Sequence, residues 1–81
     1  MITAEQIRAA RSALRWTALE LAERAGVAVQ TIKRFEAAAG VPPSRSSTLG
    51  DVKRALELAG IEFIGSPDDR PGIRVSAKKN Q

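Results

Sequence analysis

The stretch "GVAVQTIKRFE", from Gly26 to Glu36, places polar and basic side chains at helical spacing between apolar ones. Gln30 and Arg34 are four residues apart and share one face of a helix, with Lys33 beside them. An amide or a guanidinium can form paired hydrogen bonds with the edge of a base, whereas a lysine ammonium binds phosphate as a point charge. These residue types therefore predict non-covalent recognition of an anionic polymer, and the competing interpretation is a basic helix that only faces solvent.

The residue composition limits the kinds of chemistry that this protein can carry out. With 81 residues, 43% of them hydrophobic, the chain fits one small domain with a packed core. It has no cysteine, which excludes disulfides, and no histidine, which removes the commonest general base and zinc ligand. A net charge of +4 and a pI near 10.4 favour an anionic partner. We therefore expect neither an enzyme nor a cofactor or metal site.

The amino-terminal segment and the apolar runs bear on localisation. No apolar run approaches membrane-spanning length, and the early acidic residue in "MITAEQIRAA" is unlike a secretory signal. We therefore expect a cytoplasmic protein that makes no membrane contact.

Repeated start signals predict two short helices ahead of the basic stretch. Thr3 and Gln6 have the spacing of a capping box, and Thr17 and Glu20 repeat it. Gly26 is placed to end the second helix because glycine adopts the left-handed conformation of a helix C-terminus without strain. The connection between the two helices is very short, so they should meet at a sharp angle.

The third helix is predicted over residues 28–38, with Ile32 and Phe35 facing the core and Gly40 as its stop. Ala28 stands where a helix prefers a capping side chain, which we expect to cost about 1 kcal/mol.

After the third helix, the sequence predicts a loop and a fourth helix, and the spacing of its apolar residues then changes from that of helices to that of strands. Prolines and serines in "VPPSRSS" predict a loop, Thr48 with Asp51 predicts the cap of the fourth helix, and Gly60 closes it. After Gly60, "IEFI" and "GIRVS" alternate with the period of strands on either side of the turn segment "GSPDDRPG". We therefore predict a mainly α fold of four helices followed by a C-terminal β-hairpin.

The predicted organisation has three parts. They are a helical domain over 1–60, a hairpin over 61–76 and a flexible tail over 77–81. A lone hairpin is marginally stable in water, so this one should pack on the helices or form the contact between two subunits.

The segment "WTALELAERAGVAVQTIKRFE" resembles the helix-turn-helix of the Cro/C1-type family, also called the xenobiotic-response-element family, of bacterial and phage repressors. The resemblance covers roughly Ile2 to Ala59. It implies a sequence-specific transcriptional regulator, a repressor that binds double-stranded DNA as a homodimer. The third helix of each subunit would enter the major groove, and the two sites would lie about 34 Å apart.

The resemblance also assigns individual residues. Base-reading positions fall on Val29, Gln30 and Arg34. The expected phosphate ligands are Thr17, Thr31, Lys33 and Arg45. A structural ion pair between the first and third helices falls on Arg11 and Glu36.

Several alternatives remain open at this level. Val29 could pack against the core instead of touching a thymine methyl, Arg34 could bind phosphate only, and Lys33 could be a solvated charge. Ala18 and Ala28 stand where the family commonly has polar residues that face DNA. The alternative function is therefore a protein-interaction module, such as an antitoxin-like or antiactivator subunit, with weak or no DNA binding.

Overall fold

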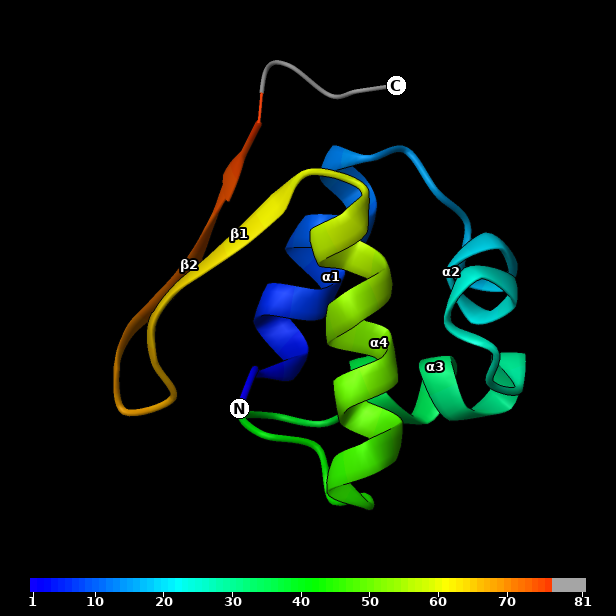
Figure 1. The fold of residues 1–81 in the computed structure, drawn as a ribbon. Helices are drawn as coiled ribbons and strands as arrows, with labels where there is room; N and C mark the ends of the chain where they lie inside the picture. The colour runs from blue at the N-terminus through cyan, green and yellow to red at the C-terminus, as the bar shows by residue number, and fades with distance from the viewer. Residues whose placement is uncertain (77–81) are drawn as a thin grey trace.

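In the computed structural model, which describes residues 1–76, four helices precede an antiparallel two-stranded hairpin (Figure 1). The elements are α1 (Ala4–Ala13), α2 (Ala18–Ala25), α3 (Val29–Ala37), α4 (Ser46–Leu58), β1 (Ile61–Ser66) and β2 (Asp69–Val75). This confirms the predicted fold class. The tail predicted over 77–81 lies outside the described residues. None of the helices in the described range is long and apolar enough to cross a membrane.

Both predicted capping boxes form at the starts of α1 and α2. Thr3 Oγ1 accepts a hydrogen bond from Gln6 N at 3.1 Å, and Gln6 Oε1 accepts from Thr3 N at 2.8 Å. Thr17 and Glu20 repeat the exchange at 3.0 and 2.7 Å. Gly26 ends α2 with φ +74°, the left-handed conformation expected there. The starts of both helices are therefore fixed by local hydrogen bonds.

The third helix is shorter than predicted. It spans Val29–Ala37, because Ala38 already adopts an extended conformation with ψ 167°. Gly40, predicted as the stop, lies three residues beyond the helix in the bend that follows, with φ +72°. Alanines favour a helix, but hydrogen bonds from α1 to the bend outweigh that preference.

The predicted cap of the fourth helix is wrong. Helix α4 begins at Ser46, with Arg45 as a cap residue that makes no side-chain hydrogen bond. Thr48 and Asp51 lie inside the helix instead. Arg45 and Ser46 are exposed, so water can satisfy the first N–H groups and no side-chain cap is required.

The two strands are longer and the turn is tighter than predicted. The strands pair Ile61 with Val75 and Phe63 with Ile73, and the turn contains only two residues, 67 and 68. A bulge between Ile64 and Ser66 absorbs part of the segment "GSPDDRPG" that we expected to form the turn.

The core lies between the helices and the inner face of the hairpin. Its largest members are Ile2, Ile7, Leu21, Ile32, Phe35, Leu49, Val52, Leu56 and Ile61. The hairpin flanks α1 and α4 on one side of the molecule, and α2 and α3 lie on the other (Figure 1). Gln6 Nε2 donates to the carbonyls of Ile64 (3.2 Å) and Gly72 (2.8 Å), so the hairpin packs on the helical domain.

Candidate nucleic-acid interface

Helix α3 presents two distinct faces. Ile32 and Phe35 are completely buried and hold the helix against the core. On the opposite side, Gln30, Lys33 and Arg34 are exposed to solvent. A three-residue connection, 26–28, joins α2 to α3, so the position of the exposed face is fixed by the packing of α2 as well. The three polar residues singled out in the sequence are therefore brought together on one accessible surface.

An ion pair fixes α3 against α1. Arg11 Nε and Nη2 donate to the two carboxylate oxygens of Glu36 at 2.7 and 2.9 Å. Arg11 Nη1 also donates to the Trp16 carbonyl at 3.0 Å. The hydrogen bond to Glu36 raises the pKa of Arg11, against the opposing effect of desolvation. The expected pair is present, and it joins α1, the turn after α1 and α3.

A second set of contacts, which sequence reasoning missed, fixes the end of α3. Arg8 Nη1 donates to the Glu36 carbonyl, and the Gly40 N–H donates to Glu5 Oε1 at 3.2 Å. Ala4 N donates to the Gly40 carbonyl at 2.8 Å. Hydrogen bonds from the Glu5 backbone and from Gly40, together with the Arg8 charge, lower the pKa of Glu5 despite some desolvation. The sequence shows only that Glu5 and Arg8 are three residues apart. That spacing does not indicate their contacts with Gly40 and Glu36.

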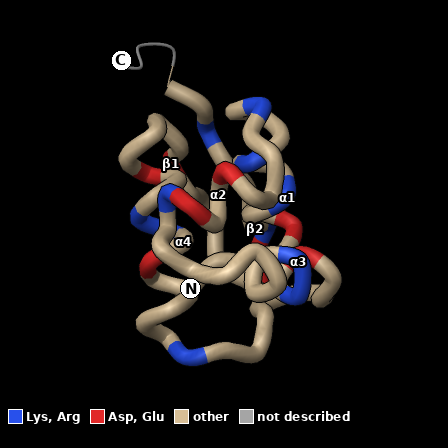
Figure 2. The backbone as a smooth tube through the Cα atoms, turned by 90° about the vertical axis from the view of Figure 1, so that its right-hand side faces the viewer, with Lys and Arg blue, Asp and Glu red and all other residues tan. Residues whose placement is uncertain are grey.

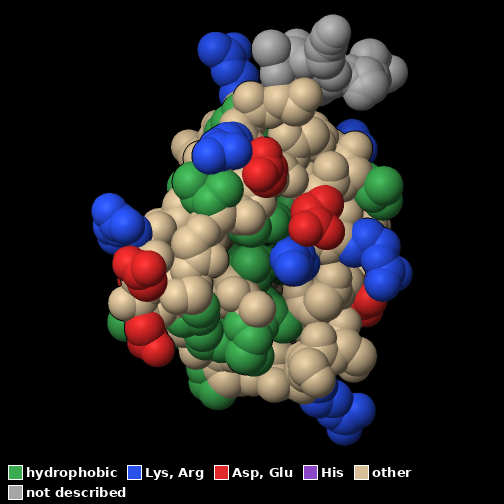
Figure 3. All heavy atoms as spheres, turned by 60° about the vertical axis from the view of Figure 1, so that its left-hand side comes forward, with side chains coloured by type: hydrophobic (Ala, Val, Ile, Leu, Met, Phe, Trp, Pro, Cys, Tyr) green, Lys and Arg blue, Asp and Glu red, His purple; other side chains and the backbone are tan. Residues whose placement is uncertain are grey.

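The basic residues fall into two groups. Five have a carboxylate within 4 Å: Arg8, Arg11, Lys53, Arg70 and Arg74. On the face shown in Figure 3, several basic side chains accordingly lie beside acidic ones. Within residues 1–76, no carboxylate partner is found for Arg15, Arg24, Lys33, Arg34, Arg45 or Arg54. The unpaired charges include every cation that the sequence assigned to DNA.

The cations of α3 and of the loop before α4 are exposed to solvent. Figure 2 shows α1 and α3 along the same side of the molecule, each with basic segments. Arg45 lies in the exposed loop just before α4, and the Arg34 guanidinium is 5.9 Å from the centre of the Phe35 ring. A guanidinium with no carboxylate partner needs to break no ion pair before it binds an external acceptor.

The remaining predicted site residues differ in accessibility. Val29 is half-buried and packs against the core, which favours the packing interpretation left open above. Thr31 is also half-buried. Thr17 is exposed, and its hydroxyl oxygen accepts from Glu20 N, which leaves its O–H able to donate. Of the three residues predicted to contact bases, Gln30 and Arg34 are therefore the two that expose hydrogen-bonding side chains.

The start of α3 has no side-chain cap. Ala28 adopts the extended conformation of a cap residue (φ −71°, ψ 145°), but no side-chain acceptor reaches the first N–H groups of the helix. Ala18 is half-buried and packs against the core, so it presents little to an external ligand. Both alanines reduce the number of polar groups at the candidate interface.

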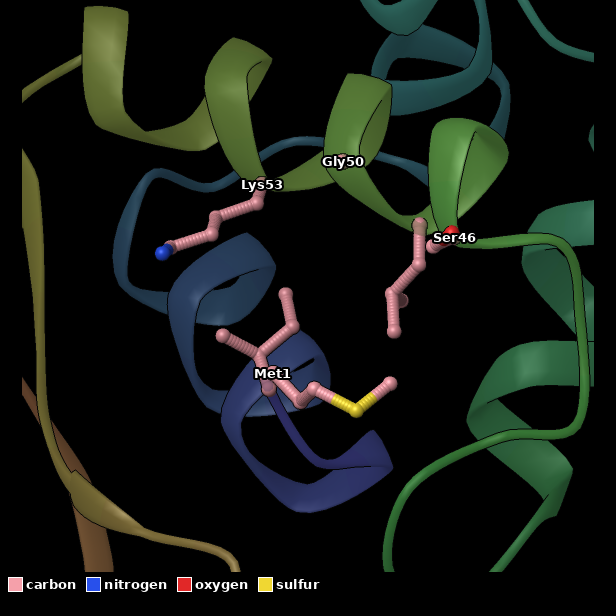
Figure 4. A pocket seen from close by; sticks show the side chains of 6 residues that line it. Met1, Ser46, Gly50 and Lys53 are labelled. Atoms are coloured by element: carbon pink, nitrogen blue, oxygen red, sulfur yellow. The ribbon is translucent and has the colours of Figure 1, made fainter.

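A small pocket lies between the amino terminus and α4 (Figure 4). It is lined by Met1, Ile2, Ser46, Leu49, Gly50 and Lys53. Lys53 Nζ is 3.9 Å from a carboxylate oxygen of Glu57. The lining is mainly apolar, with one hydroxyl, on Ser46, and one amino group, on Lys53.

The described part of the chain contains no group of three His, Cys, Asp or Glu residues that could hold a metal ion. In comparisons with known proteins, no family model and no curated protein matches this chain. Functional inference therefore rests on its own residues and their geometry.

Proposed function

We propose that this protein is a cytoplasmic, sequence-specific regulator of transcription that binds double-stranded DNA as a homodimer and acts as a repressor. Helix α3 enters the major groove, whose width admits one α-helix. The observation that carries the proposal is the exposed face of α3, where Gln30, Lys33 and Arg34 lie together with no carboxylate partner among the described residues.

The proposed roles follow from chemistry and accessibility. Gln30 pairs with adenine and Arg34 with guanine, because each can form two hydrogen bonds to one base edge. Val29, which is half-buried against the core, adds only an apolar contact with a thymine methyl group. Phosphate contacts come from Thr17, Thr31, Lys33 and Arg45, and these position the helix without reading sequence.

The fixed placement of α3 supports this proposal. A reading helix must present its side chains in a constant register, since discrimination between bases depends on hydrogen-bond geometry. Glu36 is bound through its carboxylate by Arg11 and through its carbonyl by Arg8, while Gly40 is bound by Glu5. These contacts hold the carboxyl end of α3 and leave its exposed face free.

Substitutions at two neighbouring positions of α3 test the assigned roles. Arg34→Ala should cost about 1–3 kcal/mol on the preferred duplex and reduce the preference over a random-sequence duplex. Lys33→Ala should weaken binding to both duplexes equally and reduce the salt slope of log K by about one unit. Fluorescence anisotropy titrations over a range of salt concentrations measure both quantities. Equal losses of preference in the two variants would contradict the division of roles.

The uncapped start of α3 favours one alternative. With no side-chain cap at Ala28 and a half-buried Val29, this end of the helix offers fewer polar groups than DNA readers commonly use. A protein-interaction module with the same fold, antitoxin-like or antiactivator, is the second candidate. Failure of the wild-type protein to bind any duplex at low salt would favour it.

A further inference from the structure

The turn between α1 and α2 contains an arginine in a conformation that suits glycine. Arg15 has φ +60°, and it is one of two non-glycine residues with positive φ in the described chain. The turn is held by hydrogen bonds from Arg15 N to the Ser12 carbonyl (3.0 Å) and from Trp16 N to the Arg11 carbonyl (3.1 Å). A side chain here crowds the backbone, and glycine would hold the same turn without that strain.

The guanidinium of Arg15 is also without a partner. The two preceding arginines of this region, Arg8 and Arg11, are each bound to groups of α3. No hydrogen bond, ion pair or ring contact of the Arg15 side chain occurs within residues 1–76, and the residue is exposed. The arginine side chain thus contributes no contact that would offset the strained backbone.

The position of Arg15 relative to α3 is set by its neighbours. Arg11 binds the Trp16 carbonyl with one nitrogen and the Glu36 carboxylate with the other two. A single guanidinium therefore joins the residue after Arg15 to the carboxyl end of α3. Arg15 is exposed and lies next to the residue that this guanidinium joins to α3.

We propose that Arg15 binds a phosphodiester group of the DNA strand that flanks the groove entered by α3. This inference rests on the proposed function, since it needs a duplex docked on α3. Residues kept in unfavourable backbone conformations are concentrated at functional sites, where the side chain is required. A long, permanently charged side chain with no internal partner matches a phosphate oxygen, and its contact is independent of base sequence.

The test measures binding of the full-length protein to a random-sequence duplex, together with the unfolding temperature. Arg15→Gly should lower the slope of log K against log salt by about one unit and weaken binding about 3- to 10-fold at low salt. The same variant should unfold at a temperature equal to or about 2–4 °C above that of the wild type, because the left-handed strain is relieved. Arg15→Lys should retain the wild-type salt slope, because it keeps the charge.

The chain offers a matched control at its other positive-φ arginine. Arg70 has φ +51° and lies in the hairpin, on the side opposite α3, with Asp69 3.4 Å away. Arg70→Gly should leave the salt slope and affinity unchanged. If the wild type binds duplex DNA and Arg15→Gly binds with the same slope, the assignment of Arg15 is overturned. If the wild type binds no duplex, the proposed function fails and this inference fails with it.

Discussion

Replacing Arg11 by methionine is expected to lower the free energy of unfolding by about 3 kcal/mol. The substitution removes both hydrogen bonds to the Glu36 carboxylate, whose side chain is only 12% exposed, and one to the Trp16 carbonyl. A carboxylate that is mostly buried has lost most of its hydration. Without its counter-ion, no interaction compensates for that lost hydration. A domain of 81 residues has about 4–12 kcal/mol of stability in total, so the loss should be evident in urea denaturation.

A double-mutant cycle separates the pair from the individual side chains. Glu36→Leu alone strands the Arg11 guanidinium and should also destabilise the protein. The double variant Arg11→Met/Glu36→Leu leaves neither side chain as an unpaired charge. Its loss of unfolding free energy should therefore be smaller than the sum of the two single losses by about 1 kcal/mol or more. Interaction energies of about this size are typical of residues in contact. Additive losses would show that the two side chains do not interact.

Replacing Gln6 by glutamate is the second substitution with a large expected effect, a loss of about 3 kcal/mol at neutral pH. The residue is 4% exposed, and its Nε2 donates to two hairpin carbonyls. In glutamate, one carboxylate oxygen preserves the capping box, but the other takes the place of Nε2 and faces the two carbonyl oxygens with no donor between them. Protonation of the introduced carboxyl restores one donor, so the loss should shrink as the solution is acidified.

The second capping box supplies the control for this prediction. Glu20 occupies the same position relative to Thr17 but is exposed and has no contact with the hairpin. Glu20→Gln, the reverse exchange, should change stability by less than about 0.5 kcal/mol. Thermal unfolding of both variants at neutral and acidic pH compares them directly. A small effect at Gln6 would contradict its role in attaching the hairpin.

Local signals in the sequence predicted much of this fold. The two capping boxes, the glycine at the end of α2 and the strand period after Gly60 depend on residues within a few positions of one another. Such interactions can be predicted from residue spacing because they do not depend on tertiary contacts. The buried pair Ile32 and Phe35 also followed from helical periodicity alone.

The features that sequence reasoning missed are tertiary contacts, one helix start and one backbone conformation. The contacts of Gln6 with Ile64 and Gly72 join residues more than fifty positions apart, and a capping-box motif contains no indication of them. The start of α4 was predicted at Thr48 because a side-chain cap was expected, whereas the exposed helix end uses none. The positive φ of Arg15 had no signal in the sequence, because arginine is not a residue type that favours the left-handed conformation.

The candidate site was recovered in part. Helical spacing placed Gln30, Lys33 and Arg34 on one face, and the structure shows that face exposed. Among the described residues, only Arg11 has its carboxylate partner on another helix, and helical spacing alone could not show that pair. The family resemblance had assigned Arg11 to an ion pair with Glu36, whereas nothing in the sequence indicated that Arg8 donates to the Glu36 carbonyl.

The proposed role of α3 is tested most directly by following the backbone amides of the wild-type protein while duplex DNA from the gene's own upstream region is added at low salt. The largest changes in amide resonances are expected in the amino-terminal half of α3, around Gln30 and Arg34, and in the loop at Arg45. The same changes with a random-sequence duplex should require more DNA and disappear first as salt is raised. An absence of binding, or changes confined to the hairpin, would contradict the proposal that α3 reads DNA.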